Sequence, residues 1–359
     1  YLFADIVPGN YSVKFVLPTS FIFTVLAKDS VVIVDPTHPD NSFHYNDVTS
    51  DADRKTGQTS VKTLKSGEEN YSFDAGMFIP ITVNGTTWHD LDADGIDEEN
   101  EPGLAGVTVT LFDRDGDEVQ NTTTGSDGVW EFKEMPPGTY HVKITPPKDS
   151  SGATYQLSPK PVNQTGSDFD PKTWMTTPTT FTGGQSSDGL FDAGLYLPAS
   201  IGDRIWFDDT PNGIQDGDED NFDQPVTIKL YDALGYLVNQ TTSTEAGSYQ
   251  FTNVRPGTYT LEFILPEEDY KFTLLNAGND TSADSDVSPT TGRATATVTS
   301  GEKKTDLDAG VMDFGPYYPD WTNDIQVCTN DGFDPAWLEI QEKNYLYRNK
   351  EECCKNHFW

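Results

Sequence analysis

The sequence contains few cysteines and few basic residues, and it lacks long apolar segments. Only three cysteines occur among its 359 residues, and all three lie in the last 32 positions. The 23 Lys and Arg residues are outnumbered by 58 Asp and Glu residues, which gives a formal net charge of −35. Such a charge repels phosphate, so it argues against nucleic acid and anionic membranes as partners and favours cations. No apolar run approaches the ~20 residues of a membrane-spanning helix, so we expect no membrane span.

Motifs of the common enzyme classes are also absent. The sequence has no HExxH, GxSxG or CxxC motif and no phosphate-binding loop, and its five histidines are scattered. The abundant carboxylates are spaced as cation ligands rather than as an isolated acid/base pair in a pocket. The sequence therefore predicts a protein that is not an enzyme.

What the chain does contain is an internal repeat. The segments "VPGNYSVKF" (7–15), "PPGTYHVKI" (136–144) and "RPGTYTLEF" (255–263) are alike, as are "FDAGMF", "FDAGLY" and "LDAGVM". The Asp residues of the last three motifs lie 118 and 116 positions apart, a period that indicates tandem domains rather than a solenoid. We therefore predict repeat 1 at 1–80, repeat 2 at 81–197, repeat 3 at 198–312 and a C-terminal cap at 313–359.

Each repeat has the pattern of a β-sandwich. Apolar residues alternate with polar ones at Val107, Val109 and Leu111, and again at 226–230, and turn sequences such as "DRDG" and "PPGT" separate these segments. Several short strands at about ten-residue spacing indicate an all-β, antiparallel sandwich. The joints at Pro80 and Pro198 are short and lack a Gly/Ser spacer, which favours a stiff rod, with freely hinged joints as the alternative.

The stretch "DLDADGIDEENE" (90–101) has the ligand spacing of an EF-hand calcium loop, although its flanks read as strands. A hard cation needs six to eight oxygen ligands, and a twelve-residue loop can supply them whatever flanks it. The alternative is a run of solvated acids. The candidate ligands in repeat 2 are Asp90, Asp92, Asp94, Glu98, Glu101 and the carbonyl of Ile96. The aligned candidates in repeat 3, where neutral oxygens predict a weaker or differently shaped site, are Asp208, Thr210, Asn212, Asp216, Glu219 and Ile214.

The series "IGDRIWFDD", "NGIQDGDE", "PVTIKLYD", "GSYQFTNVRPGTYTLEF" and "LDAGV" resembles the SdrD B-like repeat, which is related to the Cna B-type domains of bacterial surface adhesins. The resemblance implies tandem transthyretin-like or reverse-immunoglobulin sandwiches that bind calcium. It also implies a second acidic loop beside the first, which makes ligand candidates of one Asp-x-Asp pair in each repeat. By their spacing these aligned pairs are Asp51 and Asp53, Asp168 and Asp170, and Asp284 and Asp286. The first strands lack a lysine placed for the isopeptide bond of Cna B-type relatives, so we expect no such bond.

Features of a secreted protein are present although no secretion signal is. Seven N-x-S/T sequons predict N-linked glycans, at Asn10, Asn70, Asn84, Asn121, Asn163, Asn239 and Asn279. The alternative is that several of them occur by chance in a chain rich in Thr, Ser and Asn. In the cap we expect Cys328 to pair with Cys353 or Cys354; a vicinal bridge and a zinc site with His357 are alternatives. The cap ("YYPDW", the paired cysteines and "HFW") resembles C-terminal modules of secreted diatom proteins.

Repeat 1 matches only the second half of the other repeats. Two explanations fit this pattern. Either the chain continues upstream of "YLFADIVPGNYSVKF", or another subunit supplies the missing strands by β-augmentation, which would make a self-assembling fibre. We expect a non-enzymatic extracellular structural or adhesive protein, a calcium-stiffened, glycosylated rod that self-associates into a fibre or surface layer. The alternative is a cell-surface recognition module that binds carbohydrate or a protein ligand, with the sandwiches as spacers.

Overall fold

The structure is a computed structural model, and the residues it describes fall into several ranges. These are 1–24, 50–159, 166–209, 212–217, 219–267, 270–278, 280–313, 318–320, 327–329 and 353–355. By internal contacts the chain divides into two compact units. One unit contains Tyr1–His89 and Asp94–Leu195, and the other contains Asp90–Ala93 and Tyr196–Trp359.

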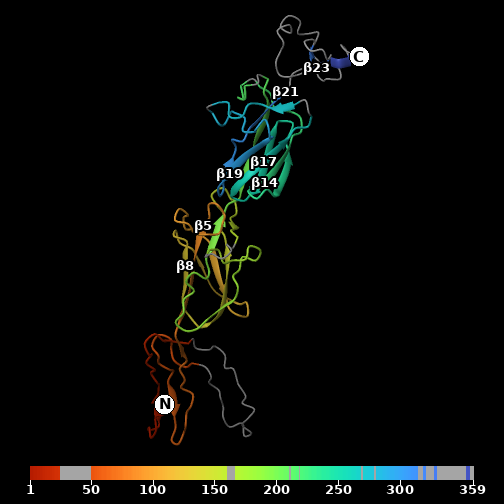
Figure 1. Cartoon of the computed structure of the whole chain (residues 1–359). Coiled ribbons are helices and arrows are strands. Elements are labelled where there is room, and N and C mark those ends of the chain that lie inside the picture. Colours follow the sequence, from red (N-terminus) through yellow and green to blue (C-terminus); the bar gives the residue numbers. More distant parts are fainter. Residues whose placement is uncertain are drawn as a thin grey trace, which may run out of the picture. The chain divides into compact units, whose positions relative to one another are not determined.

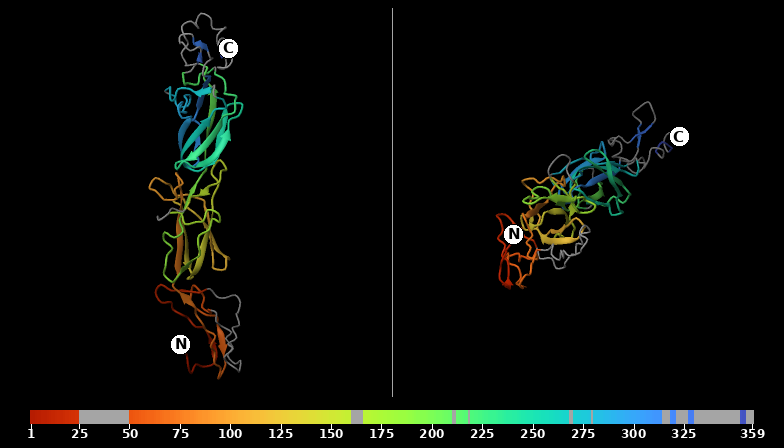
Figure 2. Two further views of the ribbon diagram at one scale, coloured as in Figure 1. Left: turned by 45° about the vertical axis from the view of Figure 1, so that its right-hand side comes forward. Right: turned by 90° about the horizontal axis from the view of Figure 1, so that it is seen from below.

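Repeat 2 is a sandwich of two four-stranded sheets (Figures 1 and 2). One sheet has the order β10-β12-β5-β8, and the other has the order β11-β9-β6-β7. The strands are β5 (Ile81–His89), β6 (Thr108–Phe112), β7 (Glu118–Thr123), β8 (Val129–Met135), β9 (Gly138–Thr145), β10 (Gln156–Leu157), β11 (Thr179–Phe181) and β12 (Ala193–Tyr196).

Repeat 3 repeats this architecture. One sheet has the order β16-β13-β21-β18, with β20 also paired to β13, and the other has the order β15-β14-β17-β19. Strands β14, β17 and β19 of this second sheet lie side by side in Figure 1. The strands are β13 (Ala199–Phe207), β14 (Thr227–Asp232), β15 (Leu237–Thr242), β16 (Ser248–Val254), β17 (Gly257–Ile264), β18 (Tyr270–Phe272), β19 (Arg293–Val298), β20 (Lys303–Lys304) and β21 (Ala309–Asp313).

The predicted alternation builds the cores. Val107, Val109 and Leu111 are fully buried, and their counterparts in repeat 3 are equally buried, whereas the residues between them are not. β8 and β16 even share one burial pattern, alternating exposed and buried side chains, as expected of a sheet with one face on the core. The all-β sandwich prediction is therefore confirmed.

One feature of the sheets differs from the expectation of purely antiparallel pairing. In repeats 2 and 3 the first strand and the strand that ends the repeat run parallel, β5 with β12 and β13 with β21. Parallel neighbours need a long crossover connection, and here the whole of the repeat separates the two strands. This pairing brings the residues that follow β5 and β13 close to the end of the repeat, which matters for the acidic sites.

The motif "PG-x-Y" that marks each repeat forms the same local structure three times. The hydroxyls of Tyr11, Tyr140 and Tyr259 each donate a hydrogen bond to the backbone carbonyl four residues earlier, at 2.5, 2.9 and 2.7 Å. This tyrosine corner fixes the start of the strand that contains the tyrosine. The recurrence of the motif in the sequence therefore reflects one recurring backbone bond.

The described part of repeat 1 contains short strand pairs. β1 (Gly9–Tyr11) pairs with β3 (Lys62–Leu64), and β2 (Ile22–Phe23) pairs with β4 (Met77–Phe78). In the cap, β22 (Tyr318–Asp320) pairs with β23 (Val327–Thr329). None of the described helical residues forms a segment that is long and apolar enough to cross a membrane.

Candidate metal centre

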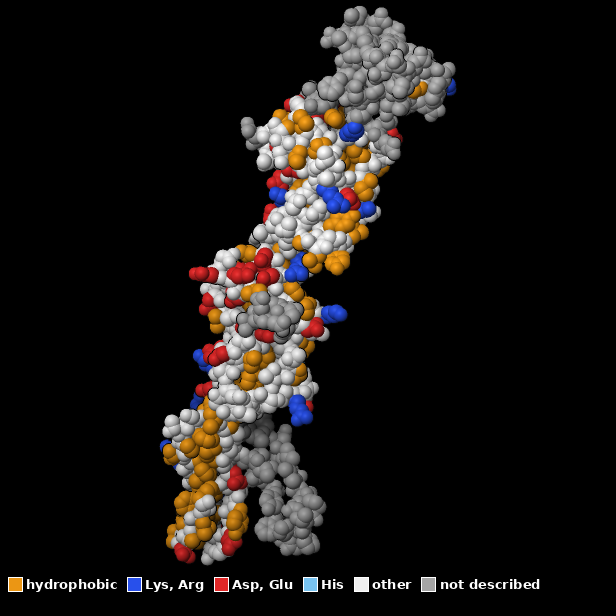
Figure 3. Space-filling view, in the orientation of Figure 1, with side chains coloured by type: hydrophobic (Ala, Val, Ile, Leu, Met, Phe, Trp, Pro, Cys, Tyr) orange, Lys and Arg blue, Asp and Glu red, His pale blue; other side chains and the backbone are white. Residues whose placement is uncertain are grey.

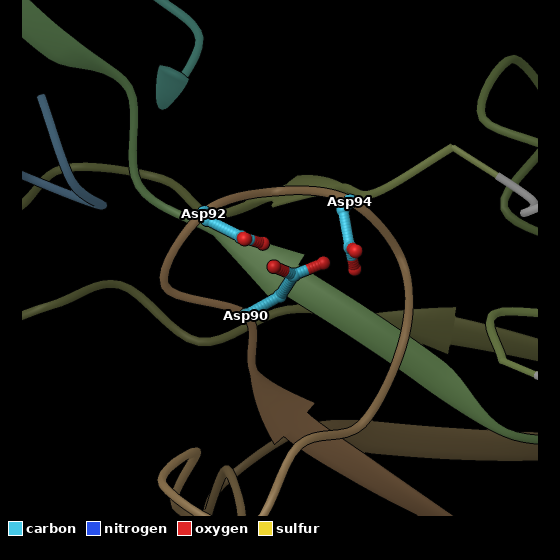
Figure 4. Close-up of side chains that lie close together, drawn as sticks. All are labelled: Asp90, Asp92 and Asp94. Carbon is cyan, nitrogen blue, oxygen red and sulfur yellow. The ribbon is translucent and has the colours of Figure 1, made fainter. Parts of the chain in front are cut away.

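The acidic loop of repeat 2 follows directly on β5 and curls back on itself. Asp90 is fully buried, and its Oδ1 accepts a hydrogen bond from the Ala93 amide at 2.6 Å. Ala93 and Gly95 both adopt left-handed backbone conformations (φ of 62° and 85°), which makes the sharp bend possible. As a result the carboxylates of Asp90, Asp92 and Asp94 point toward one another inside the loop (Figure 4).

The structure brings the predicted acidic ligands of this loop together in two overlapping groups. One oxygen each of Asp90, Asp92 and Asp94 lie within 4.8 Å of one another, and the same holds for Asp92, Glu98 and Glu101. Asp92 belongs to both groups. Five carboxylates around one loop form an all-oxygen donor set of the kind that hard divalent cations prefer.

Local hydrogen bonds hold the loop in this shape. Asp94 Oδ1 accepts the amide of Ile96 at 2.7 Å, and Glu101 Oε2 accepts the amide of Glu98 at 3.4 Å. Acidic side chains are gathered on repeat 2 in Figure 3. Close carboxylates repel one another, because each like-charge pair costs on the order of 1–4 kcal/mol at a surface-like dielectric constant. A bound dication would turn that cost into attraction.

The loop of repeat 3 has the same hydrogen bonds from backbone amides to side-chain oxygens as the loop of repeat 2, but it carries fewer negative side chains. Asn212 Oδ1 accepts the amide of Ile214 at 2.6 Å, and Glu219 Oε2 accepts the amide of Asp216 at 3.0 Å, as their counterparts do in repeat 2. Here, however, Asn212 Nδ2 donates to Asp216 Oδ2 at 3.0 Å, so an amide occupies a position that a carboxylate has in repeat 2. Thr210 lies outside the described residues.

Two buried acids lie at this second loop. Asp208 is 1% exposed, and its carboxylate accepts hydrogen bonds from the Thr273 hydroxyl and from the Gly213 amide. Asp284 is also 1% exposed, it forms a β-bridge with Ile214, and its Oδ1 has no hydrogen-bond partner among the described residues. No group of three clustered acids is found among the described residues of repeat 3, in contrast to repeat 2.

The second acidic loop recurs as a reciprocal pair with the Asp of the Asp-Ala-Gly motif. Each loop Asp donates its amide to the carbonyl of the motif Asp, whose own amide donates to the loop carboxylate. The pairs, at 2.7–3.2 Å, are Asp51 with Asp74, Asp168 with Asp192, and Asp286 with Asp308. Sequence spacing aligned Asp284 with Asp168. The hydrogen bonds put Asp286 in that place, a shift of two residues, because the connection to the motif is shorter in repeat 3.

Burial and mutual repulsion shift the pKa of several of these acids. The pKa of Asp308 rises to about 8, first because burial penalises its charge and then because Asp203 and Asp286 lie nearby. Burial also raises the pKa of Asp286, to about 6, and that of Asp192. Asp97 has a pKa raised by burial and by the charge of Asp192.

Sequence reasoning missed Asp97, Asp192, Asp203 and Asp308 as members of acidic sites. The one signal in the sequence was the recurring Asp-Ala-Gly motif, which contains Asp192 and Asp308. Asp53 and Asp170 do not take part in these reciprocal pairs. Their carboxylates instead accept hydrogen bonds from backbone amides of the turns that follow them. These hydrogen bonds lower the pKa of both groups.

The predicted glycosylation and cysteine sites have different surroundings. Asn10, Asn121 and Asn239 are exposed, and Asn70 and Asn84 are half-buried. Asn163, Asn279 and the side chain of Cys328 lie outside the described residues. Cys353 is disulfide-bonded, and Cys354 carries a buried free thiol.

Comparison with protein families decides what these repeats are. The model of the SdrD B-like domain matches residues 82–195 and 199–311, which together make up more than half of the chain. The chain belongs to the SdrD B-like domain family. It is similar to serine-aspartate repeat-containing protein F of Staphylococcus epidermidis, at 30% identity over 316 residues, and to serine-aspartate repeat-containing protein D of Staphylococcus aureus strain Newman, at 32% identity over 301 residues. These matches cover 86% and 81% of the chain, which spans only 16% and 20% of the length of these relatives.

Solved structures that are similar to the SdrD B-like chain include the Bacillus anthracis TIE protein, with a TM-score of 0.27 and 16% identity. That match covers 85% of this chain and 42% of the other. The minor pilin GBS52 of Streptococcus agalactiae is similar with a TM-score of 0.24 and 12% identity, over 65% of this chain and 95% of that one.

Proposed function

We propose that this chain is a non-enzymatic, extracellular structural or adhesive segment of a surface protein, in which calcium stiffens tandem sandwiches. Membership of the SdrD B-like family and the two tandem copies support a role in spacing and display rather than in chemistry. The described acidic groups support cation binding, since they offer carboxylate oxygens in overlapping sets. The observation that carries the proposal is the meeting of Asp90, Asp92 and Asp94 within 4.8 Å at the end of β5.

Calcium acts on stability through linkage. Without a cation, five carboxylates around the loop of repeat 2 repel one another and favour opening of the loop. An ion that binds only the folded loop stabilises the repeat by RT ln(1 + [Ca²⁺]/Kd). Residues Asp90, Asp92, Asp94, Glu98 and Glu101 would hold it, and the role of the ion is mechanical.

The predicted extracellular setting supports this assignment. Free calcium is plentiful outside cells, so weak sites are filled there. Sequons on exposed residues, a disulfide-bonded Cys353 and a large negative charge suit a secreted, glycosylated and highly soluble chain. Self-association into a fibre or layer stays a prediction from the sequence.

Small-angle X-ray scattering of the intact chain tests the stiffening. In calcium we expect a longer and narrower distribution of interatomic distances than in EGTA, because a closed acidic loop restricts local opening. Magnesium at equal ionic strength is the control, since its strict octahedral geometry fits a multidentate carboxylate loop poorly. Scattering curves that coincide in calcium and in chelator would remove the mechanical role.

A further inference from the structure

The hairpin between β14 and β15 exposes apolar side chains that the fold itself does not require. Leu234, Tyr236, Leu237 and Val238 are 82, 69, 54 and 53% exposed. The matching hairpin of repeat 2 carries Asp115, Asp117 and Glu118 instead. Both hairpins use one turn, in which Oδ1 of Asp113 or Asp232 accepts the amides two and four residues later. Exposed apolar groups in a turn that the two repeats share, and that also accommodates acids, suggest a covering ligand.

A β-bulge sets which of these side chains lie together. Leu230 is opposite Asn239, whereas the next residue on β14, Tyr231, is opposite Leu237, so Val238 is an extra residue. Asp232 donates its amide to the carbonyl of Tyr236, which is therefore opposite Asp232. Leu230 and Asp232 are two residues apart and share a face, so their partners Asn239 and Tyr236 share that face too. Without the bulge, their separation of three residues would place them on opposite faces.

Repeat 2 shows the same effect of the bulge on spacing, although its sequon residue Asn121 corresponds to Gln240 rather than to Asn239 and therefore lies on the other face of the strand. There the bulge lies between Leu111 and Phe112, and the sequon residue is Asn121, opposite Thr110. Glu118, three residues before Asn121 and opposite Phe112, accepts a hydrogen bond from Asn121 Nδ2 at 2.8 Å. Two side chains three positions apart on this strand can thus meet when the bulge lies between them. In repeat 3 the residue three positions before Asn239 is Tyr236.

We propose that Asn239 carries an N-linked glycan whose first N-acetylglucosamine packs on the ring of Tyr236 and covers the apolar hairpin. In the transfer, Asn239 Nδ2 bonds to the anomeric carbon of a lipid-linked oligosaccharide. The lipid diphosphate leaves with the bonding pair, and the amide nitrogen gives up a proton. The apolar face of the sugar then meets an exposed aromatic ring. The inference rests on the glycosylation included in the proposed function.

The glycan also protects a vulnerable part of the sheet. β15 is an edge strand, paired only with β14 among the described strands, and such edges invite pairing with other chains. The Asn239 side chain is exposed, and its Oδ1 accepts the amide of Gln240 at 2.8 Å. Asn84 contrasts with it: its Nδ2 donates to Asp188 Oδ1 at 2.7 Å and its Oδ1 accepts the hydroxyl of Ser187 at 2.9 Å. We therefore expect Asn84 to be a poor acceptor.

The first experiment maps occupancy on the chain purified from its native cells. Peptide-N-glycosidase in H₂¹⁸O converts each glycosylated Asn to labelled Asp, which mass spectrometry reads at each sequon. We expect label at Asn239 and little at Asn84. An unlabelled Asn239 beside labelled sequons elsewhere overturns this inference and leaves glycosylation of the protein standing. A chain with no label at any sequon overturns both.

The second experiment tests contact with the ring, using chain secreted by a eukaryotic host. The glycan should raise the melting temperature of repeat 3 by about 3 °C relative to the enzymatically deglycosylated chain. Tyr236→Ala should abolish this difference, while Leu237→Ala, which alters an exposed residue on the other face, should keep it. Thr241→Ala removes the sequon and should reproduce the deglycosylated value. Equal differences in the Tyr236 and Leu237 variants would overturn the packing.

Discussion

Replacing Asp92 by Asn tests the calcium loop most sharply, because Asp92 belongs to both groups of clustered carboxylates. Two unit charges 4.8 Å apart repel by roughly 3 kcal/mol at an effective dielectric constant of 20, and exposure and salt reduce this figure. Removing one charge from two such groups should therefore stabilise the cation-free repeat, by about 1–2 kcal/mol after screening. The same change removes one ligand oxygen charge and weakens binding of the cation.

The assay is differential scanning calorimetry in calcium and in EGTA. For the unchanged chain, calcium at a hundred times its Kd stabilises by about 2.7 kcal/mol, which is roughly 10 °C for a domain of this size. Asp92→Asn should raise the melting temperature of repeat 2 in EGTA by several degrees and reduce its response to calcium by more than half. The transition of repeat 3 should respond less to calcium, because Asn212 stands where repeat 2 has Asp94.

Asp115→Asn is the matched control. It removes the same charge from the exposed turn of the β6–β7 hairpin, outside both acidic groups. If the two variants behave alike, the effect is one of net charge and the reasoning about the loop fails. It fails equally if the unchanged chain melts at one temperature in calcium and in EGTA.

Three further predictions concern the sandwiches. Gly128→Ala should destabilise repeat 2 by more than about 2 kcal/mol, because φ is 73° and a Cβ would lie 1.9 Å from the Thr87 carbonyl oxygen. The control Gly116→Ala, at φ 88° with no atom near the added Cβ, should cost about 1 kcal/mol. Equal denaturation midpoints for the two variants would contradict the steric argument. Leu230→Ala should cost about 2–5 kcal/mol in urea unfolding because Leu230 is 1% exposed, and a loss under 1 kcal/mol would mean that the core can collapse around the gap. Glu262→Gln should lower the melting temperature by about 2 °C at pH 7 and by less at pH 3. Hydrogen bonds from Arg293 and then from Tyr231 lower the pKa of Glu262, so the stabilisation by its carboxylate is present above the unfolded pKa and is lost as the pH falls. A difference in melting temperature that is constant with pH would exclude the ionised carboxylate as its cause.

Much of the fold follows from local pattern. The alternation at Val107, Val109 and Leu111 fixes which face of the strand is buried, and the repeated tyrosine motif marks one backbone bond in each repeat. The parallel pairing of the first and last strands was not predicted, because no local pattern encodes which distant strands become neighbours. That choice depends on closing the whole sandwich.

The acidic loop was predictable because its ligands are contiguous in sequence, from Asp90 to Glu101. The second acidic site was harder, since Asp168 and Asp192 meet only through the pairing of distant segments. Spacing alone aligned Asp284 wrongly with Asp168, because one connection is two residues shorter. An alignment made by counting residues assumes that the loops have equal lengths, whereas an alignment made from the hydrogen bonds does not.

The two complete repeats also show how one backbone accommodates different distributions of charge. Register places Gly85 opposite Trp130 and Asp203 opposite Tyr249 at the same position of the sheet. A Cβ at Gly85 would lie 2.2 Å from the Phe191 carbonyl oxygen and 2.7 Å from the Trp130 ring, so the backbone and the indole together require glycine there. In repeat 3 Asp203 occupies this position, and its charge helps to raise the pKa of the buried Asp308. Repeat 2 thus concentrates its acids in the loop after β5, whereas repeat 3 neutralises part of that loop with an amide and places a carboxylate in the sheet. Because the loops after β5 and β13 are held by the same side-chain-to-amide hydrogen bonds, the difference in cation response between the two repeats should follow mainly from these side chains.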